Sequence, residues 1–572
     1  MRWWAGAALA AILSAGPVHA EDADPNAATR LLPATANGSL VYRVFVYLEN
    51  PGDDAARNEA VRREVAVAFP LQSGASFEEM LAEQGVRKVR ALPDVASAEY
   101  RVYKSPEAGK IWVAVLVKTG TKEEEAAEPS FWSGNLSRHL ELMKTDRGFF
   151  KLVFNGGAGL FLDNQAWFGK PQDFVATAYS PPNPTFWGEL YVEGGLGGVL
   201  ELWDTPLYLY GSATYLVSTR LGSDVFAPDP TIWGAWEKAY AGLLYAPKGS
   251  SFRLDFSLGR QLYEVNNDFL VSPIPGAVNA SYRGGSYIGA RHAYKNTASL
   301  KVLAGDLTAQ AFYLQPNELP EGDTDTRYLG ANVRWEVPAK LELAAAFMTA
   351  VTSIYPYVLP DGATRERKGL MVVNPRLMLS NPLGADGLWL QAEGAYQWNV
   401  NFPMSAWAWY GWAGYSAKKA PWTPEVSLRY AVFSGDDPST PSYNRFDQTL
   451  SGKQDYWMQG INFVKVSLNS NLRSWRATAR AKPLPGAEII LDYYYLFADT
   501  LNNLGAYYKG GQQLTDLRLA QEVMLTASWF ATPNLYTSFV ASWTTPMAGL
   551  RSALGPGTGN WLTIQLAAYW FI

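Results

Sequence analysis

The stretch 252-FRLDFSL-258 decides the fold class of this chain. Every second residue from Phe252 to Leu258 is apolar, and the three residues between them are Arg, Asp and Ser. Successive side chains of a β-strand point to opposite faces, so this segment has one apolar and one polar face. The same alternation returns at 425–432, 488–497 and 562–572. Strands with one face for lipid and one for water are typical of a transmembrane β-barrel.

The composition supports this interpretation. Charged residues make up 18% of the 572 residues and aromatic residues 14%, with 50 Gly, 22 Trp and no Cys. Such an apolar, aromatic chain is not disordered. After the N-terminal segment no run of apolar residues is long enough for a membrane helix, which excludes a helical bundle. The 48 Lys and Arg against 53 Asp and Glu, without a basic tract, argue against nucleic-acid binding.

The alternating pattern repeats from residue 149 to residue 572, with turns or polar loops between the segments. We expect about 18 strands, or about 16 as the other even number, because single-chain bacterial barrels favour even numbers. The barrel must be antiparallel and closed, since unpaired backbone groups in hydrocarbon cost several kcal/mol each. The segment SAWAWYGWAGYS at 405–416 suits an aromatic girdle at a membrane interface. The predicted fold is therefore mainly β.

The N-terminus carries a targeting signal. Residues 1–20, MRWWAGAALAAILSAGPVHA, combine one Arg, an apolar stretch and small residues before a cleavage site between Ala20 and Glu21. We therefore expect export to the outer membrane of a Gram-negative bacterium. The absence of Cys excludes a disulfide framework. Segments 21–37 and 120–148 are predicted linkers.

A small α+β domain is predicted for residues 38–119. Its pattern gives the order β-α-α-β-β, with a Ser-Phe-Glu-Glu capping box at 76–79 that opens the second helix. The expected strands and helices span 40–46, 54–69, 76–92, 98–104 and 110–118.

This region resembles a POTRA domain, the periplasmic module of outer-membrane assembly and two-partner secretion proteins. The resemblance depends on ALPDVASAEYRV at 91–102 followed by GKIWVAVLVK at 109–118. An unrelated small α+β domain is the alternative. The resemblance implies a periplasmic location and a periplasmic protein partner, since such domains can add a strand to a client peptide.

The barrel region resembles the alginate-export family. The resemblance implies an 18-stranded pore that conducts a polysaccharide. The domain in front of the barrel departs from that family, so the substrate stays open. The segments that carry the resemblance are NGGAGLFLDNQAWFGK (155–170), GRQLYEVNNDFLV (259–271), YAVFSGDDPSTPSYNRFDQ (430–448), NSNLRSWRATARAKP (469–483) and LDYYYLFAD (491–499).

The two-residue alternation of side chains along each predicted strand selects candidate pore-lining residues. Arg476, Arg480 and Lys482 share one predicted face, and cations that line water would attract anionic sugars. The alternative is that these cations pair with Glu488 and Asp492 on the next strand. The same parity places further cations and anions on the lumen face, a mixture too balanced to imply alginate itself. They are Arg253, Arg291, Arg334, Arg376, Arg429 and Glu393.

The predicted function is an outer-membrane pore for export or passage of a polymer, with a polysaccharide as the expected substrate. One alternative is POTRA-dependent protein translocation or outer-membrane assembly, and another is a structural or adhesive barrel with a plugged lumen. Translocation would need an Arg-Gly motif in a late loop, whereas the match at 282–285 comes too early. No motif predicts an enzyme, a cofactor or a metal site. The expected partners are outer-membrane lipid, the polymer and a periplasmic protein.

Overall fold

The protein was analysed as a computed structural model. It describes residues 29–571 except 53, 105–110, 121–140, 175–178, 274–279, 338–339, 438, 452–456 and 503–513. The predicted signal peptide and its cleavage site at Ala20 and Glu21 lie outside the described residues.

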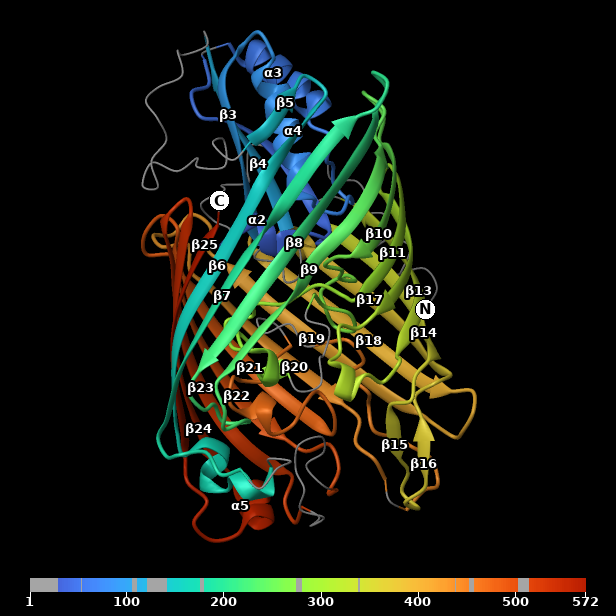
Figure 1. The fold of residues 1–572 in the computed structure, drawn as a ribbon, viewed down its shortest axis with the longest axis vertical. Coiled ribbons are helices and arrows are strands. Elements are labelled where there is room, and N and C mark those ends of the chain that lie inside the picture. The colour runs from blue at the N-terminus through green and yellow to red at the C-terminus, as the bar shows by residue number, and fades with distance from the viewer. Residues whose placement is uncertain are drawn as a thin grey trace.

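Eighteen antiparallel strands form a closed barrel, which confirms the predicted fold (Figure 1). The barrel closes where β25 pairs with β6, from Leu562 opposite Asn164 to Phe571 opposite Asn155. The short β5 (Glu141–Thr145) pairs with the start of β6, within the segment that we expected to be a linker. The barrel strands are β6 (Gly148–Asn164), β7 (Thr185–Glu201), β8 (Leu207–Leu221), β9 (Thr231–Tyr245), β10 (Phe252–Arg260), β11 (Asn296–Ala304), β12 (Leu307–Gln315), β13 (Arg327–Val337), β14 (Leu341–Thr352), β17 (Leu370–Ser380), β18 (Leu388–Asn399), β19 (Ala406–Ser416), β20 (Glu425–Phe433), β21 (Leu472–Ala481), β22 (Ala487–Phe497), β23 (Arg518–Thr532), β24 (Leu535–Pro546) and β25 (Trp561–Phe571).

The two faces of the barrel wall differ in polarity. On β10, Phe256 and Leu258 are exposed on the outside, whereas Arg253 and Asp255 are buried on the inside. This alternation continues around the barrel, so large apolar side chains cover the outer wall and polar side chains line the interior. The outer wall thus matches the hydrocarbon of a membrane.

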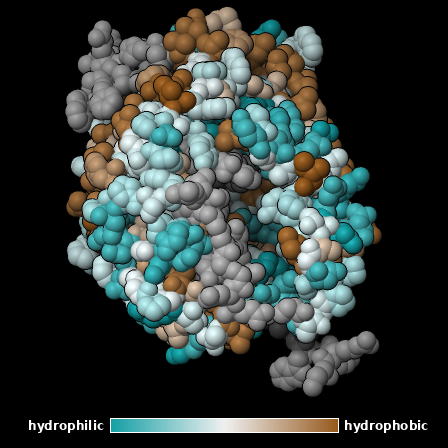
Figure 2. All heavy atoms as spheres, turned by 60° about the horizontal axis from the view of Figure 1, so that its bottom comes forward, coloured by the Kyte–Doolittle hydropathy of each residue, from teal (hydrophilic) through white to brown (hydrophobic). Residues whose placement is uncertain are grey.

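The two ends of the barrel differ in the length of their connections. At the end that we name the turn end the strands are joined by short segments, such as 305–306 and 533–534. At the opposite end, named the loop end, the connections include the long segments 261–295, 353–369 and 434–471. Figure 2 views the molecule toward the loop end, which shows many hydrophilic residues. The loop end also carries the hairpin of β15 (Pro356–Val358) and β16 (Thr364–Glu366), and α5 (Ala548–Leu554).

The N-terminal region has the predicted order β-α-α-β-β. Its sheet has the order β1-β3-β4-β2, with β4 parallel to β2 and antiparallel to β3. Two elements lie where we expected a linker, and β1 adds a strand beside β3. We name residues 29–119 the N-terminal domain. Its elements are β1 (Thr29–Leu31), α2 (Pro33–Ala36), β2 (Val41–Leu48), α3 (Ala55–Ala68), α4 (Glu79–Arg90), β3 (Val95–Lys104) and β4 (Ile111–Thr119).

The predicted capping box at the start of α4 is wrong. Ser76 forms an isolated bridge with Leu40, and the helix begins only at Glu79. The N-cap residue is Glu78, whose side chain caps nothing, while the Asn37 side chain accepts a hydrogen bond from the Glu79 N–H at 2.8 Å. A residue distant in sequence therefore satisfies the helix end, in place of the local pair.

The N-terminal domain sits in the turn end of the barrel (Figure 1). Helix α4 packs against β7 and β8, and one apolar cluster contains residues of both the domain and the barrel wall. Among the described residues, no helix is long and apolar enough to cross a membrane.

Candidate functional site: a barrel closed by its N-terminal domain

Charged side chains of α4 meet opposite charges on the inner barrel wall. The Lys88 Nζ lies 2.5 Å from the Glu201 carboxylate and donates to the Tyr208 hydroxyl at 2.7 Å. These side chains are at least four-fifths buried, so salt screens them less than surface pairs. The other ion pairs of this contact are Glu79 with Lys151, Glu83 with Lys151 and Arg87 with Glu141.

Apolar packing accompanies these ion pairs. Met80 of α4 lies against β7 at Gly197, where an added Cβ would come within 2.9 Å of the Met80 sulfur. Phe149 and Val199 of the wall belong to the same apolar cluster as the core of the domain. The domain therefore contacts the barrel wall through apolar packing as well as through ion pairs.

Two glycines let the domain backbone approach the barrel closely. Gly38 has a φ of +82°, and a Cβ there would lie 2.5 Å from the Leu262 carbonyl oxygen. Gly74 has a φ of +86°, and a Cβ there would lie 2.6 Å from the Thr308 hydroxyl. Both positions need glycine for conformation and for space. This contact extends the docked surface from β7 and β8 to β12.

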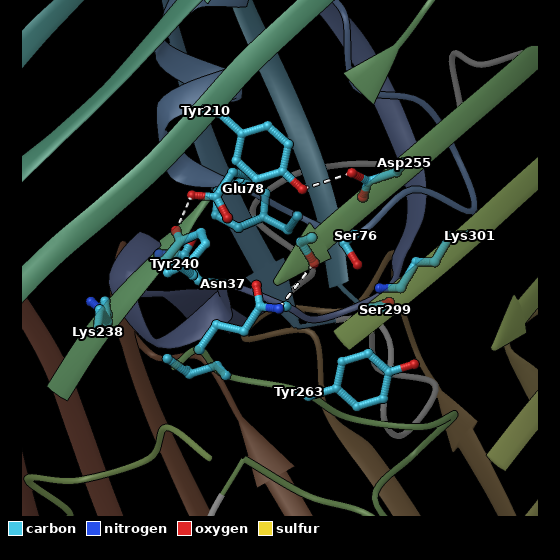
Figure 3. Close-up of a pocket in the computed structure, with 15 residues that line it drawn as sticks. Asn37, Ser76, Glu78, Tyr210, Lys238, Tyr240, Asp255, Tyr263, Ser299 and Lys301 are labelled. Carbon is cyan, nitrogen blue, oxygen red and sulfur yellow. Dashed lines mark hydrogen bonds between the residues drawn. The ribbon is translucent and has the colours of Figure 1, made fainter. Parts of the chain in front are cut away.

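A polar junction lies where α4 begins. The Tyr240 hydroxyl donates to the Glu78 carboxylate at 2.5 Å, and the Tyr210 hydroxyl donates to Asp255 at 2.7 Å. Figure 3 shows these side chains around a small cavity of about 20 Å³, together with Lys301 of the wall. That volume holds about one water molecule. Burial raises the pKa of Glu78 to about 8, although the Tyr240 hydrogen bond opposes the shift.

The raised pKa of Glu78 predicts that docking weakens as pH rises. The undocked carboxyl would titrate near its ordinary value of 4.5, whereas the docked carboxyl titrates near 8. The docked state thus holds an extra proton between these values, and its advantage is lost as pH rises through that window. Glu79 and Asp255 also raise this pKa and Lys238 lowers it. Proteolysis of the domain in the purified full chain should therefore be faster at pH 8.5 than at pH 5.

The matched control is Glu78→Gln, which keeps the hydrogen-bonding shape without a titrating group. This variant should lose most of the pH dependence of proteolysis. An unchanged dependence in Glu78→Gln would assign the effect to other groups. Burial also raises the pKa of Glu83, which acts in the same direction.

Two long loops fold into the barrel from the loop end. Three carboxylates of the wall hold them, and each accepts hydrogen bonds from two consecutive backbone N–H groups. A charged acceptor makes these bonds stronger than neutral ones. Glu189 accepts from the N–H groups of residues 287 and 288, Glu237 from those of residues 292 and 293, and Glu522 from those of residues 462 and 463.

The arginines of β21 are paired with carboxylates. Arg476 makes two hydrogen bonds to Asp492, at 2.8 and 2.9 Å, and Thr478 donates to the same carboxylate at 2.5 Å. Arg480 lies 3.4 Å from Glu488. The geometry thus follows the alternative that we considered, in which these cations pair with Glu488 and Asp492. Lys482, the third member of the predicted row, lies in the turn after β21.

A second network crosses β13, β14, β17 and β18. Arg334 lies 3.3 Å from Glu336 and 3.5 Å from Glu342. Arg376 lies 3.5 Å from Glu342 and 3.9 Å from Glu393. All five side chains are nearly fully buried, so the predicted lumen residues Arg334, Arg376 and Glu393 hold one another.

The remaining predicted residues have separate surroundings. Arg253 donates to the carbonyl oxygens of residues 247, 250 and 252 in the adjoining turn. Arg291 belongs to the infolded loop 261–295 and donates to carbonyls of β8 and β9. Arg429 donates to Gln459 at 3.0 Å and lies over the ring of Trp457.

No local sequence pattern indicated the docking residues. A helix with alternating acids and bases, such as α4, is usually a solvated surface, and we assigned no role to Lys88 or Glu83. The role of the wall carboxylates Glu189 and Glu237 was also not predicted, because their partners are backbone groups of a distant loop. Within the described residues, no cluster of three or more acidic or histidine side chains is placed to hold a metal ion.

The closed barrel, its apolar outer wall and its polar interior define an outer-membrane channel barrel. A sequence profile of the alginate export family matches residues 235–555, more than half of the chain. The chain therefore belongs to the alginate export family, as the resemblance predicted. The N-terminal domain lies outside the matched residues. A search of curated proteins found no match.

Several solved structures are similar to this chain. The structure of Pseudomonas aeruginosa OccK5 (OpdH) has 12% identity and a TM-score of 0.43, over 74% of this chain and 98% of that one. The outer membrane protein OprD from Pseudomonas aeruginosa has 11% identity and a TM-score of 0.46, over 74% and 93%. Acinetobacter baumannii OccAB1 has 11% identity and a TM-score of 0.45, over 74% and 97%.

Proposed function

We propose that this outer-membrane channel carries a polysaccharide from the periplasm to the outside. The family match over residues 235–555 is the observation that carries the proposal. Short turns of such barrels face the periplasm and long loops face outward. This orientation would put the turn end and the N-terminal domain in the periplasm, where a polymer arrives.

The chemistry of the interior supports a hydroxylated substrate. The inner wall combines arginine–carboxylate pairs with inward aromatic side chains such as Tyr410 and Trp412. Sugar hydroxyls can both donate to carboxylates and accept from guanidinium groups, while aromatic faces cover the apolar faces of sugar rings. The pairing of the cations leaves the wall without a strong excess of positive charge.

The N-terminal domain gives the channel a closed state. The domain sits in the turn end, and the loops 261–295 and 434–471 fold inward from the loop end. A polymer could pass only after one or both of them shift. A periplasmic protein that binds the domain would supply the free energy for such a shift, in keeping with the predicted POTRA-like role.

Deletion of the gene from its host tests the proposal. Extracellular polysaccharide should fall sharply and polymer should accumulate in the periplasm, with recovery when the full chain is restored. The measurement is uronic acid and total sugar in medium and periplasm. Unchanged polysaccharide in both fractions would overturn the proposal and leave a structural barrel.

Protein translocation is the second candidate, favoured by the β-α-α-β-β order of the N-terminal domain and its sheet edge at β2. The same deletion strain separates the two candidates. Loss of a secreted protein with normal polysaccharide would support translocation and refute polysaccharide passage.

A further inference from the structure

A hollow of about 500 Å³ lies between the N-terminal domain and the rim of the turn end. Residues of β1 and β3 form one side, and the turns 417–424, 482–486 and 533–534 form the other. The ion pairs of α4 reach β5, β6 and β7, whereas the turns that border this hollow join strands between β19 and β24. We name it the rim hollow.

Cations converge on the rim hollow from both sides. Arg30 and Arg101 come from the domain, where Arg101 also forms an ion pair with Glu99, and Lys482 comes from the barrel turn. None of the ion pairs found among the described residues includes Arg30, whose guanidinium lies 4.9 Å above the Phe530 ring. Burial, and then the neighbouring charge of Arg101, lower the pKa of Arg30. An anion in the rim hollow would relieve both of these costs.

Aromatic side chains line the same space. Trp422, Phe530 and Tyr536 face the rim hollow, and Trp422 is 65% exposed. Trp422 has a φ of +66° and Thr423 a φ of +40°, a left-handed backbone at two bulky residues in succession. Such backbone strain is concentrated at binding sites. The turn thus holds an exposed indole beside three cations.

The rim hollow also leads toward the interior row of arginines. Glu488 lines it, accepts a hydrogen bond from Thr29 at 2.5 Å and lies 3.4 Å from Arg480. Arg480 and Arg476 follow Lys482 on the inward face of β21. A charged chain held in the rim hollow would therefore meet further guanidinium groups along one strand.

We propose that the rim hollow binds one end of an acidic saccharide chain before transport. Arg30, Arg101 and Lys482 hold sugar carboxylates, since guanidinium and carboxylate match as a two-pronged pair. Trp422 and Phe530 pack against the sugar rings. This inference rests on the proposed function, and it adds a binding site at the rim and a part for the N-terminal domain. Four of its lining residues, among them Arg30 and Arg101, belong to that domain, so the site exists only when the domain is docked.

Binding of oligogalacturonate to the purified full chain tests this inference. Titration followed by calorimetry and by Trp fluorescence should give saturable binding to the wild type, with a neutral maltooligosaccharide of equal length binding far more weakly. Arg30→Gln and Lys482→Gln should each weaken binding about tenfold or more, the usual loss for one charged hydrogen bond. The control is Arg57→Gln, an exposed arginine of the same domain paired with Asp94, and it should leave the affinity unchanged.

Each result supports or refutes a separate part of this inference. Heat-modifiable gel mobility shows whether each variant is folded. If the folded Arg30→Gln and Lys482→Gln variants bind oligogalacturonate as tightly as the wild type, the proposed site is wrong. Equal binding of the neutral oligosaccharide would overturn the acidic specificity. If polysaccharide release in cells survives either result, the channel function stands without the rim hollow. If oligogalacturonate binds as expected while gene deletion leaves polysaccharide unchanged, the site stands and the transport function fails.

Discussion

Removal of the N-terminal domain should turn a nearly silent barrel into an open channel. A chain that begins at residue 141 keeps β5 and all barrel strands but loses the N-terminal domain, which sits in the turn end. Ion flow depends on the free cross-section, so single-channel conductance in planar bilayers should rise several-fold over the full chain. The infolded loops 261–295 and 434–471 remain and should keep the current below that of an empty barrel.

A charge-swap series checks the same mechanism without deletion. Lys88→Glu should place a second carboxylate face to face with Glu201, loosen the domain and raise the conductance. Glu201→Lys alone should act in the same way, and the double variant should restore the low conductance because the pair is re-formed. A folded, shortened barrel with the conductance of the full chain would show that the domain is not the plug.

Loss of the Asp492 carboxylate should be the most destabilising single change in the barrel wall. Arg476 stands directly opposite Arg429 in the register of β20 and β21, and Asp492 makes two hydrogen bonds to Arg476. Asp492→Ala leaves two buried guanidinium groups side by side. Removal of one partner of a buried ion pair costs about 3–5 kcal/mol, and the free energy of unfolding in urea with lipid vesicles should fall by that amount.

The double variant Arg476→Met with Asp492→Leu is the matched test, since it removes both charges. It should be more stable than Asp492→Ala, because apolar replacement of a whole buried pair is often nearly neutral. Asp516→Ala, which removes an exposed partner of Arg518, should leave unfolding unchanged. A double variant less stable than Asp492→Ala would contradict the role of uncompensated charge.

Local patterns predicted the barrel well. Alternation at 252–258 and 488–497 depends only on neighbours in sequence, and the structure places Phe256 and Leu491 outside and Asp255, Glu488 and Asp492 inside. The element order of the N-terminal domain followed for the same reason. The capping box failed because Ser76 pairs with Leu40, a partner that no local pattern contains.

The candidate site was predictable only in part. Parity identified Arg476 and Asp492 as neighbours on an inward face, and the alternative that they pair is the one that the structure follows. The partner of Arg291 could not be inferred in this way, because its loop folds back onto β8 and β9. Loop paths depend on contacts between segments far apart in the chain, which a two-residue period does not encode.

Side-chain periodicity is enough to predict a lipid-facing barrel preceded by a small α+β domain, because it fixes which face of each strand is apolar. The position of the domain inside the turn end, and the docking role of α4, depend instead on contacts between segments far apart in the chain. The charged face of α4 is the same whether it meets water or a wall of opposite charges. A docked helix differs from a solvated one in the position of Glu201 and Lys151, which closure of the barrel brings opposite α4.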